Sequence, residues 1–294
     1  MSVYIEIFTT PQAMQTLTIP EVAALCDLRY GISDGSYVLA QGETGKYNIL
    51  FSAPIGRGVE VSLEARKVGI VLPLPNTPHD IALCYRLVEK LCAHLQAESF
   101  VRDGETIPAA EAPFLVPIEL QASLNAIRNM EQELRDGKQQ TFSVFGALNP
   151  IVLGLREFDA IGGTLDGYEI LLDHLQQLDA WYAVARFFRL EGEDGTGPVV
   201  GMFFISEDTP VVLPLDPAPA YQQVEGVDGY YVRIPGESDI PYAEFLSHVE
   251  QEQRYDAAHV VVRLSSETIR HLAQHHAVNM VTRKPQPREY APGE

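Results

Sequence analysis

The sequence predicts an α+β fold, with a mixed, mainly antiparallel sheet, helices packed on one face, and two similar-sized halves. Three observations lead to this fold class. The stretch over residues 68–105 reads as strand, helix and strand. Hairpin patterns recur elsewhere and interrupt any regular alternation of strands with helices. The 294 residues, 46% of them hydrophobic, suffice to bury a core in one large domain or two medium ones.

The helix that begins after Thr77 is the clearest single element. Thr77 suits the N-cap, Pro78 the first helical position, and Asp80 the positive end of the helix dipole. Apolar residues then recur at helical spacing on a face wider than one stripe, which indicates cover on more than one side. The strand over residues 68–74 is almost entirely apolar, as expected for a strand buried on both faces. We therefore expect residues 68–100 to form the centre of the core.

The rest of the first half contains a first strand, a short helix and a hairpin. Glycines within the turn at residues 54–58 supply the backbone freedom of a hairpin turn. Residues 108–117, rich in Ala, Pro and Glu, are predicted to be a connecting loop. A helix with one narrow apolar stripe follows and ends before Gly137, a typical C′ residue. The predicted strands are 3–8, 37–41, 47–53, 59–64, 68–74 and 99–105, and the predicted helices begin at 18 or 19, 78 and 120.

The second half is predicted to begin after Gly137, which gives halves 1–137 and 138–282 and a flexible tail 283–294. Asp166 and Glu169 resemble a capping box at the start of a helix that runs to Tyr182. Residues 151–155 fit a strand or a helix equally well, and residues 214–219 are predicted to be a rigid loop. The other predicted strands are 141–145, 183–190, 199–205, 211–215, 230–234 and 259–264, and the other predicted helices are 242–250 and 266–278.

Charge and cysteine content restrict the class of protein. A formal net charge of −19 repels DNA, RNA and anionic lipid, and it favours either a basic partner or solubility. The N-terminal residues lack a signal-peptide pattern, and no apolar run reaches the ~18 residues of a membrane span. Cys84 and Cys92 lie on one helix face about 12 Å apart, too far for a disulfide. We therefore expect a cytoplasmic protein with reduced cysteines, Cys26 included.

The final helix carries the most chemically informative spacing. Glu267, His271 and His275 stand four residues apart and so share one helix face. Carboxylate and imidazole groups are suitable ligands for a divalent metal, and histidines at this spacing can chelate one. The alternative is an ordinary exposed polar face, since no H-E-x-x-H motif is present.

Other motifs in the sequence also have ordinary structural explanations. Residues 31–35 read G-x-S-x-G, but a helix precedes and a strand follows, the reverse of a hydrolase elbow. Arg57, between two glycines, presents a cation to an anionic ligand or is an ordinary turn residue. The acidic loop 191–197 lacks the spacing of a calcium or phosphate loop. Trp181 and Tyr182 are predicted to pack at the end of a helix.

Residues 55–62, IGRGVEVS, and 102–105, RDGE, resemble an uncharacterised bacterial family, the domain of unknown function 4299. The resemblance covers the first third of the chain. It implies a bacterial cytoplasmic protein and carries no activity, cofactor or site residues with it.

Two functions follow as hypotheses. The first is a non-enzymatic, acidic binding or interaction protein, for example an immunity-type protein that occupies a basic toxin; it needs no cofactor, nucleic acid or membrane. The alternative is a metal-dependent hydrolase that uses Glu267, His271 and His275. Neither hypothesis specifies an oligomeric state.

Overall fold

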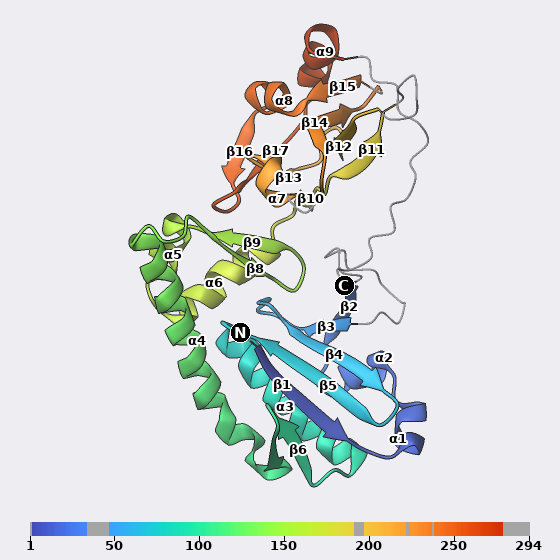
Figure 1. Cartoon of the computed structure of the whole chain (residues 1–294), viewed down its shortest axis with the longest axis vertical. Helices are drawn as coiled ribbons and strands as arrows, with labels where there is room; N and C mark the ends of the chain where they lie inside the picture. The colour runs from blue at the N-terminus through green and yellow to red at the C-terminus, as the bar shows by residue number, and fades with distance from the viewer. Residues whose placement is uncertain (1, 34–46, 191–196, 222–223, 237, 279–294) are drawn as a thin grey trace. The chain divides into compact units, whose positions relative to one another are not determined.

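The structure, a computed structural model, describes residues 2–33, 47–190, 197–221, 224–236 and 238–278 (Figure 1). The chain forms two compact units, Met1–Leu178 and Asp179–Glu294. Both contain helices and mostly antiparallel sheets, which confirms the α+β class. The predicted boundary after Gly137 lies inside the first unit. A division of the chain into folding halves at that residue stays a prediction. The predicted strand 37–41 and tail 283–294 lie outside the described residues.

A seven-stranded sheet organises the first unit, with the order β2-β3-β4-β5-β1-β6-β7. All neighbouring strands of this sheet pair antiparallel, including the predicted hairpin of β3 with β4. A sheet of this kind needs one buried face only. Buried and half-buried residues alternate along the strand Lys67–Pro73, so the prediction of a strand buried on both faces was wrong. Its strands are β1 (Ser2–Phe8), β2 (Arg29–Ser33), β3 (Tyr47–Phe51), β4 (Val59–Glu64), β5 (Lys67–Pro73), β6 (Ser99–Arg102) and β7 (Glu105–Pro108).

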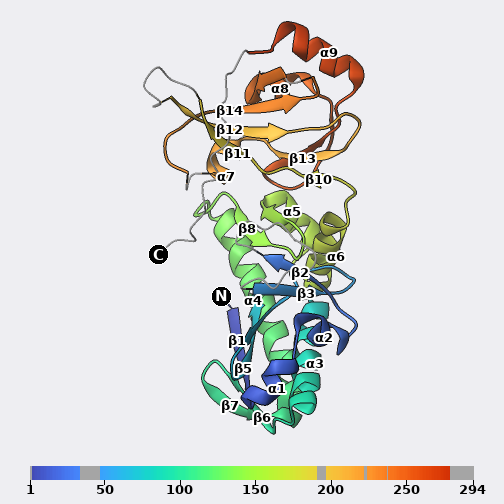
Figure 2. The same ribbon diagram turned by 90° about the vertical axis from the view of Figure 1, so that its right-hand side faces the viewer.

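Helix α3 (Pro78–Leu95) packs on one face of this sheet, as predicted for the centre of the core. Thr77 is its N-cap and accepts a hydrogen bond from the Asp80 backbone amide at 3.1 Å. Cys84 and Cys92 are buried free thiols on its apolar face. The short helices α1 (Pro11–Thr16) and α2 (Ile19–Ala24) contribute to the same core (Figure 2). The layer of helices therefore covers a single face of the sheet.

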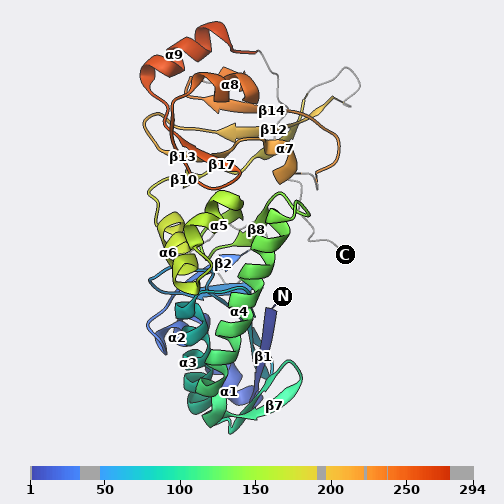
Figure 3. The same cartoon turned by 90° about the vertical axis from the view of Figure 1, so that its left-hand side faces the viewer.

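Helix α4 (Ala112–Arg135) begins well before the predicted start at residue 120, so the prediction of a loop over 108–117 was wrong. A short 3₁₀ helix, Ala109–Glu111, leads into it. Pro113 lies in the first turn, where proline costs no hydrogen bond, and Pro117 is accommodated further along. Ala112 is fully buried against the core of the first unit. Packing thus decides the start of α4, which runs beside α3 (Figure 3).

The first unit ends with a hairpin and two helices. These are β8 (Phe142–Phe145), β9 (Pro150–Leu153), α5 (Leu155–Ile161) and α6 (Leu165–Gln176). Residues 151–155, left open by the sequence, divide between β9 and the start of α5. Thr164 rather than Asp166 caps α6, because its side chain accepts from the Gly167 amide at 3.0 Å.

The prediction that this helix continues to Tyr182 was wrong. Trp181 and Tyr182 form the short strand β10, which pairs in parallel with β13. The Trp181 amide donates to the Pro210 carbonyl at 2.8 Å, and the Trp181 side chain is 65% exposed. Pairing with β13 draws Trp181 and Tyr182 into a sheet, and apolar periodicity along the chain gives no sign of such a distant partner.

The second unit is built from two four-stranded sheets that share one core, with orders β10-β13-β17-β16 and β11-β12-β14-β15. Helices α8 and α9 contribute Phe245 and Leu272 to that core. The elements are β10 (Trp181–Tyr182), β11 (Arg186–Arg189), β12 (Val199–Phe204), β13 (Val211–Pro214), α7 (Pro217–Ala220), β14 (Val227–Ile234), β15 (Ser238–Pro241), α8 (Tyr242–His248), β16 (Gln251–Arg254), β17 (His259–Val262) and α9 (Ser266–His275).

Most predicted strands of this unit are present, and β11 pairs with β12 as expected. The prediction of a loop over 214–219 was only partly right, because α7 begins at Pro217, after its N-cap Asp216. Strands β15 and β16 were missed; β16 is entirely exposed, so it has no apolar alternation to detect. No helix among the described residues combines the length and apolar character needed to cross a bilayer.

Replacing Tyr168 with phenylalanine is expected to leave the free energy of unfolding unchanged or raise it by about 1 kcal/mol, since its buried hydroxyl makes no hydrogen bond among the described residues. Burial raises the pKa of Tyr168 to about 12. A raised pKa means that the folded state favours the protonated phenol. The free energy of unfolding of the wild type is therefore unaffected by this group below about pH 10 and falls as pH rises toward 12. Urea unfolding at pH 8 and pH 11 should show an extra loss of about 1.4 kcal/mol in the wild type. An equal loss in Tyr168→Phe would contradict this account.

Candidate functional site

The predicted metal ligands all lie on α9. Glu267 is in its first turn, and His271 and His275 follow on the same helix. The rings of the two histidines are 4.9 Å apart, and all three side chains are exposed. Among the described residues, one group of three possible metal ligands has its ligand atoms close together. This group includes His271 but neither Glu267 nor His275.

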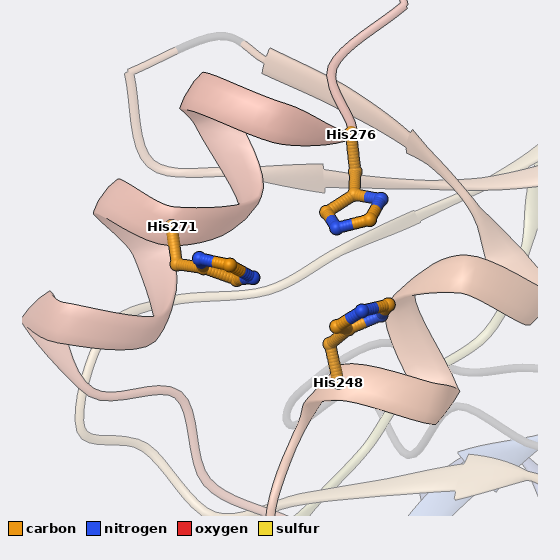
Figure 4. A group of neighbouring side chains, drawn as sticks. All are labelled: His248, His271 and His276. Carbon is orange, nitrogen blue, oxygen red and sulfur yellow. The ribbon is translucent and has the colours of Figure 1, made fainter.

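His271 instead meets two histidines from outside the predicted set, His248 and His276 (Figure 4). His248 ends α8, and His276 is the C-cap residue of α9. One ring nitrogen of each lies within 4.8 Å of those of the other two. The ring centroids of His248 and His276 are 4.1 Å apart. We call these three residues the histidine cluster.

The carboxylate of Glu244, one turn before His248 on α8, lies beside this cluster. Its Oε2 is 3.4 Å from His276 Nδ1 and 4.0 Å from His248 Nδ1. The Glu244 backbone carbonyl also lies 2.8 Å from His248 Nδ1. Since a carbonyl only accepts, Nδ1 carries a proton, and in the neutral ring this leaves the Nε2 lone pair of His248 for a ligand.

Arg57, predicted as a ligand-binding residue, has its guanidinium hydrogen-bonded within the protein. Its Nη1 donates to the Pro75 carbonyl at 2.8 Å, and its Nε donates to the Phe145 carbonyl at 3.0 Å. The side chain therefore connects the segment before α3 with the end of β8. Binding of an anionic ligand by Arg57 stays a prediction.

The backbone of the same turn encloses Asp80. The amides of Arg57 and Gly58 donate to Asp80 Oδ2 at 2.7 and 2.9 Å. A side chain at position 56 would collide with that carboxylate, so glycine is required there. Burial raises the pKa of Asp80, which is completely inaccessible, while the two amides oppose the shift. This arrangement anchors the β3–β4 turn to the start of α3.

Two hydroxyl–imidazole pairs resemble parts of a catalytic triad. Ser52 Oγ lies 2.8 Å from His79 Nε2, and the His79 amide donates to Glu169. Tyr182 Oη lies 2.8 Å from His259 Nε2, whose Nδ1 is 2.8 Å from Asp256 Oδ1.

Structural roles account for both pairs. Asp256 Oδ1 also accepts from the amides of Ala258 and His259, so it orders the turn between β16 and β17. Burial raises the pKa of Tyr182, which keeps its phenol protonated. The Ser52–His79 bond joins the end of β3 to the start of α3. In the G-x-S-x-G motif, residues 31–33 lie on β2 and residues 34–35 lie outside the described residues.

The face of the seven-stranded sheet opposite α3 carries exposed aromatic rings. In Figure 1 the strands β1, β5 and β4 lie in front of α3, so this face is turned toward the viewer. Tyr4 and Phe8 are 59% and 54% exposed. Glu6 lies between them on the same side of β1, because side chains alternate along a strand. Glu60 and Glu64 point the same way from β4. We call these five residues the open face.

Charges on the open face are partly paired. Lys67 Nζ lies 2.6 Å from Glu6 Oε1 and 3.4 Å from Glu64 Oε1. Burial raises the pKa of Glu60, and the nearby Arg57 opposes this. With one lysine among three carboxylates, this surface combines aromatic rings with an excess of acidic groups.

The sequence offered a weak signal for the histidine cluster and almost none for the open face. His276 directly follows the predicted His275, but His248 is on another helix and no spacing rule connects it to α9. Tyr4 and Phe8 fit the alternation of β1, yet which side of that strand remains uncovered depends on where the helices pack.

A family model described as a domain of unknown function (DUF4299) matches residues 2–272. The match covers nearly the whole chain, well beyond the first third on which the sequence resemblance was based. Comparison with curated proteins and with solved structures gave no match.

Proposed function

The chain belongs to the DUF4299 family, whose description names no activity, and on that premise we propose that it is a non-enzymatic binding protein for a basic protein partner. The open face is the proposed contact surface. An immunity-type protein that neutralises a basic toxin in the bacterial cytoplasm is one example of this role. The buried free thiols of Cys84 and Cys92 suit that reducing compartment.

Exposed aromatic rings beside carboxylates are the observation that carries this proposal. Large aromatic side chains dominate the energetics of many protein interfaces, and Tyr4 and Phe8 are held by an ordered strand in the middle of a sheet. The formal net charge of −19 would attract a basic partner over a longer range and raise its association rate. Rings would thus supply affinity, and carboxylates would select for positive charge.

The double variant Tyr4→Ser/Phe8→Ser is expected to bind a basic partner at least about tenfold more weakly, because it loses two aromatic contacts without a change of charge. A labelled peptide of alternating lysine and valine provides a defined basic probe. Fluorescence anisotropy measures its Kd for wild type and variant. Binding should also weaken between about 50 mM and 200 mM salt, since exposed charges are screened.

The matched control is Phe114→Ser/Ile118→Ser on α4, which removes two apolar side chains that are 75% and 54% exposed. This control should bind the basic peptide as the wild type does. Equal weakening by both double variants, or equal affinity for a glutamate–valine peptide, would contradict binding at the open face. Circular dichroism should show the same fold in all three proteins, because every substituted side chain is exposed.

A metal-dependent hydrolase is the second candidate, and the gathering of His271 with other imidazoles favours it. In such an enzyme the metal would polarise a substrate carbonyl or activate a water molecule. The predicted Glu267 and His275 would then lie beside the reacting groups. Stoichiometric metal is the first requirement, so purified protein that retains no Zn, Mn or Ni after supplementation would remove this candidate.

A further inference from the structure

We propose that His248, His271 and His276 form a binding site for a divalent transition-metal ion with the ligand preferences of zinc. The site lies wholly within the second unit. It does not depend on partner binding at the open face, so that proposal and this one can fail separately, and it requires no hydrolytic activity of the bound ion. The argument rests on how the histidines are held, which of their nitrogens are available, and what charge surrounds them.

Core packing holds the three histidines together. Phe245 of α8 and Leu272 of α9 are completely buried in the core of the second unit, and the two helices are in contact. His248 follows Phe245 by three positions, and His276 follows Leu272 by four, so each lies on the same side of its helix as the buried anchor. His271 directly precedes Leu272. The imidazoles therefore meet at the rim of a fixed helix contact.

The hydrogen bonds of His248 prepare it as a ligand. Its Nδ1 lies 2.8 Å from the Glu244 backbone carbonyl oxygen and 2.9 Å from the Ser247 hydroxyl oxygen. Metal-binding histidines commonly donate their second ring N–H to a carbonyl or carboxylate in this way, which fixes the ring and directs the other nitrogen at the ion. The Glu244 carboxylate, 3.4 Å from His276 Nδ1, can do the same for His276.

The donor set selects the class of metal. Imidazole suits Zn²⁺, Ni²⁺, Cu²⁺ and Co²⁺, whereas Mg²⁺ and Ca²⁺ require oxygen ligands. At a Zn–N distance of about 2.1 Å, tetrahedral ligands are about 3.4 Å apart, so nitrogens within 4.8 Å must approach by a modest rotation of the side chains. His248 and His271 are exposed and can make this adjustment. Glu244 adds a negative charge that offsets part of the charge of the ion.

Titration of the full-length, chelator-treated protein with ZnCl₂ tests the proposal. Isothermal titration calorimetry should show about one equivalent of Zn²⁺ bound with a Kd in the micromolar range or below. His248→Ala, His271→Ala and His276→Ala should each weaken binding at least about tenfold, since each removes one of three ligands. Zn²⁺ should also raise the Tm of the wild type and leave that of His271→Ala nearly unchanged.

His275→Ala is the matched control, because it removes a neighbouring exposed imidazole from the same helix. Its Kd should stay within about twofold of the wild-type value. Cys26→Ser serves as a second control, because Cys26 is the free thiol that is not fully buried. The variants alter surface side chains, so their circular dichroism should match that of the wild type.

Three results would overturn the proposal. Binding of much less than one equivalent at about 100 µM Zn²⁺ would exclude a site of useful affinity. Equal losses in His275→Ala and His271→Ala, with none in His248→Ala, would assign the metal to the face with Glu267 instead. Loss of binding in Cys26→Ser would show that a thiolate holds the ion.

Discussion

Replacing Glu119 with alanine is expected to lower the free energy of unfolding by about 3–5 kcal/mol. Glu119 lies on α4 and is 1% exposed. Its Oε1 accepts from Tyr85 Oη at 2.7 Å and from Arg102 Nη2 and Nε at 2.6 and 3.0 Å. The alanine variant leaves the guanidinium without its buried counter-charge and the phenol without its acceptor. Urea denaturation measures the change.

Two comparisons separate this effect from a general loss of charge. Glu131→Ala removes an ion pair with Arg135 from the same helix, and because that arginine is exposed to solvent the variant should lose far less stability than Glu119→Ala. The double variant Glu119→Leu/Arg102→Met removes both charges and should recover much of the stability lost in Glu119→Ala. A Glu119→Ala variant as stable as Glu131→Ala would show that the buried pair does not hold α3, α4 and β6 together.

Replacing Asp80 with alanine is expected to lower the free energy of unfolding by about 3 kcal/mol. The amides of Arg57 and Gly58 would lose their acceptor, and removal of a costly buried carboxylate would offset only part of that loss. Asp80→Asn retains an acceptor oxygen and should lose less. Asp166→Ala, in the exposed first turn of α6, changes only the interaction with a helix dipole and should cost about 0.5 kcal/mol.

The destabilisation of Asp80→Ala should also depend on pH. Burial raises the pKa of this carboxyl, so its stabilising contribution is complete below the unfolded value near 4 and declines as pH rises through the higher folded value. The difference between wild type and variant should therefore be larger at acidic than at neutral pH. A difference that grows toward neutral pH would show that the two amides outweigh burial and lower the pKa instead.

The α+β class and the family could both be recognised from residues close together in the chain. Thr77, Pro78 and the apolar spacing after them specify α3 through local capping and amphipathicity. The motif around Arg57 pointed to the family whose model matches residues 2–272. Errors arose where distant packing overrides local preference, as at Trp181, which joins β13 rather than extending α6.

The sequence predicted only one member of the histidine cluster. His271 was among the predicted ligands, but the predicted companions followed from spacing along one helix. The actual neighbours come from the end of α9 and from α8, and their meeting depends on the packing of Phe245 and Leu272 in one core. Spacing along α9 likewise predicted Glu267 as the carboxylate of the site, whereas the carboxylate that lies beside the cluster is Glu244, from α8.

By itself, the sequence determined the elements whose signals are local: the cap and apolar face of α3, the alternation of β1, the β3–β4 hairpin, and the acidic character of the chain. The tertiary structure alone decided which sheet face stays uncovered and which imidazoles converge. It also decided that Glu119 is buried beside Arg102. The physical reason is that capping and periodicity act over a few residues, whereas burial and ligand geometry arise when elements far apart in the chain pack together.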